Sequence, residues 1–164
     1  MQTMIIFGPL FTHAERTWNR LLAEAIQKAS GASIRVILPQ EETQRLLKTI
    51  GATNEQDAIA QMCFDNAINA DVAVAILDGA DADSGTCVEI GWRKGQNPSA
   101  PVIGVRTDSR ISEDQGLNLM LGRGLKVRAC DIVLYFTSWD TDLEQIAKSI
   151  VAEAQRVTRT IRSE

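Results

Sequence analysis

Short apolar runs alternate along the chain with longer segments in which apolar residues recur every three or four positions. The runs are rich in Val and Ile and lack strict polar alternation, which is typical of strands that are covered on both faces. They predict five strands, at Thr3–Phe7, Ser33–Leu38, Val72–Leu77, Pro101–Arg106 and Ile132–Phe136. The intervening segments predict five helices, at about Ala14–Ala29, Glu41–Ile50, Glu55–Ala70, Thr86–Lys94 and Leu143–Thr160.

This alternation predicts the fold class. We expect one α/β domain over residues 1–164, built as a doubly wound, flavodoxin- or Rossmann-like, five-stranded parallel sheet with helices on both faces. Residues Thr107–Cys130 form the one long stretch without a predicted element. A segment of this length within a compact domain is usually functional or lies at an interface.

Polar residues stand where several of these helices should begin. Thr12, followed three residues later by Glu15, predicts a capping box at the start of the first helix. Asn54 is expected to cap the third helix, and Asp140 or Thr141 the last.

Composition and charge narrow the class of partner. The formal net charge of −4 argues against a nucleic-acid surface, which needs clustered Lys and Arg. The apolar stretches are too short to span a bilayer, so no membrane partner is expected. Cys63, Cys87 and Cys130 are odd in number and widely spaced, which predicts a reducing cytoplasmic location and no zinc or disulfide pattern. His13 is the only histidine, so a Ser-His-Asp triad or a His-based zinc site is not expected.

The segment Asp78–Glu89 places four carboxylates within twelve residues, directly after a predicted buried strand. The carboxyl end of a parallel strand is where open α/β sheets bind ligands. If Asp83 or Ser84 caps the following helix, Glu89 leans back toward the helix start and over Gly85, which has no side chain. The pattern predicts a small open pocket with a carboxylate along its wall and backbone N–H groups at its floor.

Carboxylates in this arrangement suit reactions at a sugar. An ionised Glu89 could attack an electrophilic carbon such as a sugar C1′, whose transition state is cationic. A second carboxylate would then protonate the leaving group, and Asp65 on the preceding helix is a candidate. Asp71 is expected at the opposite edge of the sheet in a structural role, and Asp78 and Asp81 could be ordinary loop residues. A magnesium site or a plain helix cap with a solvent-facing glutamate are the alternatives.

The residues around this segment resemble a known family. The run Asp83–Gly91, Asp-Ser-Gly-Thr-Cys-Val-Glu-Ile-Gly, resembles the D-x-G-x-x-x-E-[LIV]-G signature of the nucleoside 2-deoxyribosyltransferases. The opening Ile6–Thr12 resembles their first strand and loop. Pro39-Gln40, Asp65-Asn66 and Asn118-Leu119-Met120 match in order and approximate spacing. Five blocks in order are more specific than the signature alone.

The resemblance implies a role for each matching residue. Glu89 would be the nucleophile that forms a covalent deoxyribosyl-enzyme, and Asp83 and Asn118 would hold the sugar 5′-hydroxyl. Asp65 would lie near the base and assist its protonation. The residues implied to line the rest of the substrate pocket are Phe7, Gly8, Phe11, Gln40, Gly85 and Met120.

The resemblance also implies partners. The substrates would be 2′-deoxynucleosides and free nucleobases, and the reaction would need no cofactor and no metal. In this family the segment matching Asn118–Met120 commonly reaches a neighbouring subunit's site, which implies a homo-oligomer. An acidic Asp83 suits a hydroxyl donor and would repel a 5′-phosphate. The related nucleotide N-glycosidases usually have serine at that position.

Other readings of the same residues stay open. A nucleoside or nucleoside 5′-monophosphate N-glycosidase could use the same site, with water as the acceptor. A non-enzymatic nucleotide-sensing module would not need Asp65, Asp83 and Glu89 together. Phe7 could equally be a core residue. Ile6 and Leu10 stand where members from lactic acid bacteria often have aromatic residues, which leaves the base and the 2′-position of the preferred sugar undetermined.

Overall fold

The computed structural model describes residues 1–49, 54–110, 117–122 and 129–162. Its five strands form one sheet in which every neighbouring pair is parallel, in the order β2-β1-β3-β4-β5. The flavodoxin-like order and the parallel sheet confirm the predicted fold class. The strands are β1 (Gln2–Phe7), β2 (Ile34–Ile37), β3 (Val72–Ile76), β4 (Val102–Arg106) and β5 (Ile132–Tyr135).

Each predicted helix is present, with ends that lie within three residues of the prediction. A further short helix lies within the stretch for which the sequence predicted no element. The helices are α1 (His13–Ala29), α2 (Pro39–Leu47), α3 (Glu55–Asn69), α4 (Ser84–Gln96), α5 (Leu119–Gly122) and α6 (Leu143–Arg162). α2 begins earlier than predicted because Pro39 occupies its first turn, where a missing N–H costs no hydrogen bond.

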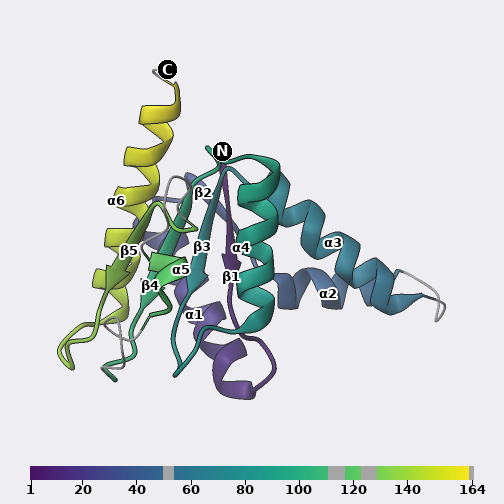
Figure 1. Ribbon diagram of the computed structural model, residues 1–164, viewed down its shortest axis with the longest axis horizontal. Coiled ribbons are helices and arrows are strands. Elements are labelled where there is room, and N and C mark those ends of the chain that lie inside the picture. Colours follow the sequence, from purple (N-terminus) through teal and green to yellow (C-terminus); the bar gives the residue numbers. More distant parts are fainter. Residues whose placement is uncertain (50–53, 111–116, 123–128, 163–164) are drawn as a thin grey trace.

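Helices cover both faces of the sheet (Figure 1). On one face, Leu22 and Ile26 of α1 and Ile150 of α6 pack against Ile6 and Val74 of the central strands. On the other face, α3 and α4 pack against β1 and β3. The central strand β3 is buried along its whole length, which explains why its sequence shows no polar alternation.

The helix starts confirm one predicted cap and correct two. The Thr12 side chain accepts a hydrogen bond from the Glu15 N–H, and the Glu15 carboxylate accepts one from the Thr12 N–H, as a capping box requires. Asn54 stands at the start of α3 but makes no capping hydrogen bond, because its left-handed backbone (φ 69°) turns the side chain away. The last helix is capped by Asp142, which accepts from the Gln145 N–H at 2.8 Å, and not by Asp140 or Thr141.

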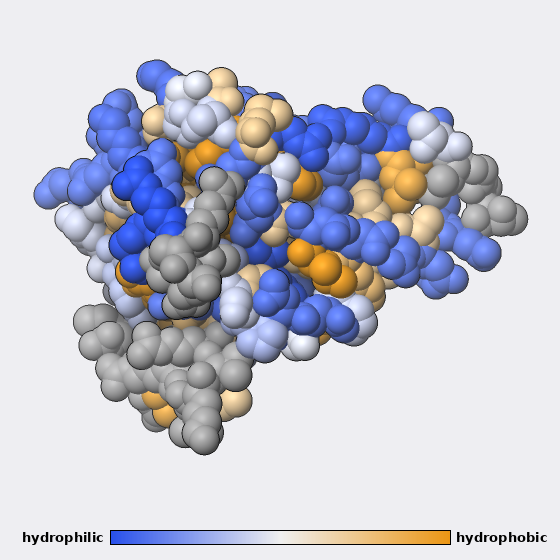
Figure 2. All heavy atoms as spheres, turned by 90° about the horizontal axis from the view of Figure 1, so that it is seen from above, coloured by the Kyte–Doolittle hydropathy of each residue, from blue (hydrophilic) through white to orange (hydrophobic). Residues whose placement is uncertain are grey.

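The two ends of the strands lie on surfaces of different character. Figure 2 views the molecule from the side where β1 begins and α6 ends, and the surface there is mostly hydrophilic with small, separate apolar patches. The opposite surface, at the carboxyl ends of the strands, carries the loops that follow β1 and β3. The chain leaves β1 toward β2 on one side and leaves β3 toward β4 on the other, so these two loops diverge and leave a crevice between them. Among the described residues, no helix is long and apolar enough to cross a membrane.

Candidate active site

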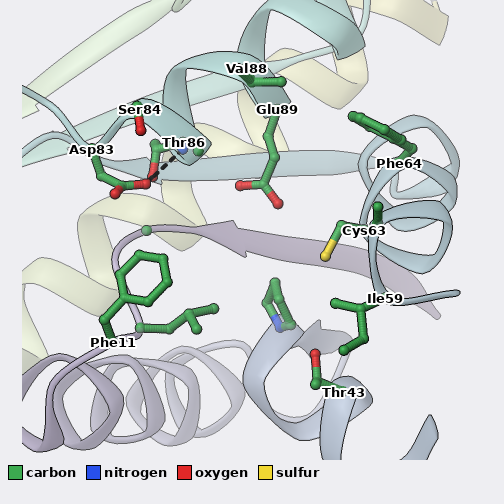
Figure 3. Close-up of a pocket in the computed structure, with 15 residues that line it drawn as sticks. Phe11, Thr43, Ile59, Cys63, Phe64, Asp83, Ser84, Thr86, Val88 and Glu89 are labelled. Atoms are coloured by element: carbon green, nitrogen blue, oxygen red, sulfur yellow. Dashed lines mark hydrogen bonds between the residues drawn. The ribbon is translucent and has the colours of Figure 1, made fainter. Parts of the chain in front are cut away.

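A cavity of about 480 Å³ opens at this crevice, between the loop after β1, the start of α4, and the helices α2 and α3. Apolar side chains make up most of its surface, and the carboxylates of Asp83 and Glu89 face it from α4 (Figure 3). The residues that line it are Gly8, Leu10, Phe11, Pro39, Thr43, Ile59, Ala60, Cys63, Phe64, Asp83, Ser84, Gly85, Thr86, Val88 and Glu89.

Asp83 is the N-cap of α4, one of the two positions that the sequence predicted. Its Oδ2 accepts hydrogen bonds from the Thr86 N–H at 2.9 Å and from the Thr86 hydroxyl at 3.1 Å. Among the described residues, none donates a hydrogen bond to the other carboxylate oxygen, Oδ1. The cap therefore fixes the carboxylate at the cavity edge and leaves one oxygen able to accept a hydrogen bond from a ligand.

Gly85 keeps this end of the cavity open. A Cβ at position 85 would lie 3.1 Å from Asp83 Oδ2, so a side chain there would press on the capping carboxylate. The glycine thus leaves space at the helix start, as the sequence predicted, and it also preserves the Asp83 cap.

Glu89 lies one and a half turns further along α4, and its carboxylate points into the middle of the cavity (Figure 3). Burial and, to a smaller extent, the nearby charge of Asp83 together raise the pKa of Glu89 to about 7. The carboxylate is thus held in a weakly solvated place where an electrophile can approach it, and its negative charge is less stabilised by water than that of an exposed glutamate.

The α3 wall that faces Glu89 carries Cys63, with Ile59, Ala60 and Phe64 on the same side of the helix. Asp65 does not reach the cavity. Its side chain is exposed and accepts a hydrogen bond from Gln61 at 2.9 Å. Residues two apart on a helix point to nearly opposite sides, so the position of Cys63 in the cavity turns Asp65 outward. Asp65 therefore does not line the cavity, contrary to the expectation from the sequence.

Asp78, at the start of the same loop, anchors it to the neighbouring strand. The Asp78 carboxylate accepts hydrogen bonds from the Thr107 N–H and hydroxyl and from the Asp108 N–H. The buried guanidinium of Arg106 donates to the carbonyls of Leu77 at 2.5 Å and Gly79 at 3.2 Å. Asp78 therefore ties the end of β3 to the end of β4, which holds the loop that leads to Asp83.

Gly79 is required by the same loop. Its φ of +111° lies in the region that favours glycine, and a Cβ there would lie 2.8 Å from the Asp81 carbonyl oxygen. Asp71 lies at the opposite edge, as predicted, where its carboxylate accepts hydrogen bonds from the N–H and hydroxyl of Thr3.

The remaining predicted pocket residues divide into two groups. Gly8 and Phe11 line the cavity, and Phe11 lies beneath Asp83 in Figure 3. Phe7 is fully buried in the core between β1 and the α3–α4 layer, so its role is packing. Gln40 turns toward α1, where its amide donates to the Arg16 carbonyl at 2.9 Å and accepts from Asn19 at 3.4 Å. Neither Phe7 nor Gln40 lines the cavity.

Asn118 and Met120 also lie away from the cavity of their own chain. Both are exposed, Met120 by 75%, on the short helix α5 and the residue before it. The Asn118 side chain accepts a hydrogen bond from the Met120 N–H at 2.9 Å.

Sequence reasoning missed the α2 and α3 side of the cavity. Thr43, Ile59, Cys63 and Phe64 carry no motif, and their only signal is the spacing that places Ile59 and Cys63 on one side of a helix. Among the described residues, no three His, Cys, Asp or Glu side chains are grouped so that they could hold a metal ion.

The sequence matches a known protein family. The family model described as nucleoside 2-deoxyribosyltransferase matches residues 6–120, which include the loop after β1, the residues that line the cavity and the first two residues of α5. No curated protein matches the chain.

Two solved structures show a similar fold. A conserved protein from Enterococcus faecalis V583 is 24% identical, with a TM-score of 0.65 over 95% of this chain and 98% of that chain. A 2-deoxyribosyltransferase from Bacillus psychrosaccharolyticus is 20% identical, with a TM-score of 0.63 over 93% and 95% of the two chains. At this identity the likeness concerns the fold alone.

Proposed function

Since the chain belongs to the nucleoside 2-deoxyribosyltransferase family, we propose that it exchanges the base of 2′-deoxynucleosides through a covalent deoxyribosyl-Glu89 intermediate. One observation carries this proposal. The Glu89 carboxylate points into a largely apolar cavity whose edge is marked by a second, fixed carboxylate, that of Asp83. Such a cavity can hold a flat base on its apolar part and a polar sugar on its carboxylate side.

The proposed reaction has two half-reactions. In the first, a Glu89 carboxylate oxygen forms a bond to the sugar C1′, the bond from C1′ to the base nitrogen breaks, and the base leaves with the electron pair. In the second, the nitrogen of an incoming base attacks C1′, which releases the Glu89 carboxylate, and the nitrogen gives its proton to solvent. Two displacements at C1′ retain the configuration of the sugar.

Asp83 gives the site its preference for a free 5′-hydroxyl. The sugar 5′-hydroxyl would donate a hydrogen bond to the Asp83 oxygen that the Thr86 cap leaves open. A 5′-phosphate in the same place would bring negative charge next to a carboxylate that is already beside Glu89. We therefore expect nucleosides to be far better substrates than their 5′-monophosphates.

The second polar contact to the sugar comes, in this proposal, from a neighbouring subunit. Asn118 and Met120 are exposed and do not line the cavity of their own chain, although they lie in the part of the chain that the family model matches. A homo-oligomer in which α5 of one subunit covers the Asp83 side of the next site would bring Asn118 to the 5′-hydroxyl.

A base-exchange assay tests the proposed function. Mixing 2′-deoxyinosine with adenine should yield 2′-deoxyadenosine and hypoxanthine, measured by liquid chromatography, whereas 2′-deoxyinosine 5′-monophosphate should react at least about tenfold more slowly because of charge repulsion. Glu89→Ala serves as the inactive control. Free 2-deoxyribose as the sole sugar product would identify a hydrolase instead, and preference for the monophosphate would contradict the assignment of Asp83.

A further inference from the structure

The two ends of the cavity are lined by different residues. Asp83 and Phe11 lie at one end, Glu89 points into the middle, and Cys63, Ile59 and Thr43 lie at the other end (Figure 3). If the 5′-hydroxyl contacts Asp83 and C1′ lies at Glu89, the base must extend beyond Glu89 toward the α2 and α3 end. The wall that the base would meet there is made by Cys63, Ile59 and Thr43.

This wall offers no carboxylate within the part of the chain that the structure describes. The two carboxylates that line the cavity, Asp83 and Glu89, both come from α4. Asp65 is exposed on the far side of α3. Burial raises the pKa of the Cys63 thiol, and the charge of Glu89 raises it further, so the group facing the base stays a neutral S–H at pH 7. A thiol is only a weak hydrogen-bond donor.

We infer that Cys63 faces the leaving base and that the base departs without protonation by a protein carboxylate, so that the chain selects nucleosides whose base is a good leaving group. This inference rests on the proposed function, since it concerns the first half-reaction at the same site. Cys63 acts as a specificity-determining residue, because it occupies the position from which an acid would otherwise assist poor leaving groups.

The first half-reaction then balances without a protein acid. The Glu89 oxygen bonds to C1′ and the base departs with the electron pair of the C1′–N bond. Solvent water supplies the proton that the departing nitrogen takes up. The negative charge that develops on the base is not relieved by the wall, so the rate of departure follows the acidity of the free base.

A series of 2′-deoxyuridines tests this inference on the intact protein. The substrates are 5-fluoro-2′-deoxyuridine, 2′-deoxyuridine and thymidine, whose bases are similar in shape and become less acidic in that order. The rate of base release in single turnovers should fall steeply along the series, by roughly 100-fold, which is the scale of assistance that a general acid supplies. Cys63→Ser should keep this spread, whereas Cys63→Asp should narrow it by accelerating thymidine most.

Asp65→Asn tests the alternative that Asp65 is the acid that protonates the leaving base. The structure predicts that this substitution leaves the spread of rates unchanged, because Asp65 faces solvent. A slower release of thymine in Asp65→Asn, or rates within about threefold across the series in the unaltered protein, would overturn the inference while base release continues. Absence of base release from all three nucleosides would also overturn the inference if 2′-deoxyinosine still exchanges its base with adenine, because 5-fluorouracil is a good leaving group. Absence of both activities would instead overturn the proposed function, and this inference with it.

Discussion

At the scale of single residues, the environment of Glu89 lowers the free energy of unfolding when the carboxylate is ionised. Burial and Asp83 raise the pKa of Glu89 from an ordinary 4.5 to about 7. The folded protein therefore binds a proton more tightly than the unfolded chain does. The stability that comes from this group is fully present below pH 4.5 and is lost as the pH rises through 7.

Glu89→Gln should remove this pH dependence. At pH 5 the variant and the unaltered protein should differ little in this respect, whereas at pH 8 the variant should gain up to about 3 kcal/mol in free energy of unfolding, at about 1.4 kcal/mol per pKa unit. Urea denaturation at both pH values measures the difference. Glu24→Gln, on the exposed side of α1, is the matched control. Equal changes for both variants between pH 5 and pH 8 would contradict the shifted pKa.

What the sequence reveals about a residue depends on whether its neighbours are local. The geometry of Asp83, Gly85 and Glu89 follows from a cap and a helical turn, and the structure has them facing one cavity as predicted. The direction of the Phe7 side chain could not be predicted, because each residue of a strand covered on both faces is apolar whichever way it points. The position of the Gln40 side chain could not be predicted either, since it binds an α1 carbonyl far away in sequence.

At the scale of elements, the strands and their arrangement in one parallel sheet followed from the alternation of apolar runs with helical segments, but the rotation of α3 did not. Apolar residues occur around much of that helix, as Met62, Phe64 and Ala67 show, so the sequence did not indicate which side faces the site. The side is set by packing against α4, where the Phe64 and Trp92 rings lie 4.8 Å apart. This is why Cys63 took the place expected for Asp65.

Arg93 joins the two helices that form the site. Its buried guanidinium donates to the carbonyls of Ala67, Ala70, Asp71 and Pro101, at the end of α3 and the start of β4. Arg93→Met should lower the free energy of unfolding by at least about 3 kcal/mol, because several buried carbonyls would lose their donors. Chemical denaturation checks this, with Arg35→Met on β2 as an exposed control. A loss no larger than the control's would show that α3 is held by apolar packing alone.

At the scale of the whole molecule, the parallel sheet determines where the site lies. The strand order reverses between β1 and β3, and the cavity opens at that point, as the fold class led us to expect. The sequence stretch from Thr107 to Cys130 could not be interpreted in the same way. Part of it lies outside the described residues, and in its short helix α5 Leu119 and Met120 are exposed on a single chain while Leu121 is buried.

Mixing two inactive variants tests whether sites are shared between subunits. Glu89→Ala lacks the nucleophile and Asn118→Ala lacks the proposed contact to the 5′-hydroxyl. If Asn118 acts in a neighbour's site, exchanged mixtures of the two should regain about a quarter of the activity, because random assembly pairs an intact Glu89 with an intact Asn118 in that share of sites. No recovery in a mixture that is shown to exchange subunits would place Asn118 outside the neighbour's site.

The central claim is that Glu89 carries the sugar between two bases. The most direct measurement is peptide mass spectrometry of the protein denatured in acid during turnover of 2′-deoxyinosine without an acceptor base. We predict one 2-deoxyribosyl group on the peptide that contains Glu89, which disappears when adenine is added before denaturation. A sugar on another residue such as Cys63, or base exchange that continues in Glu89→Ala, would contradict the account.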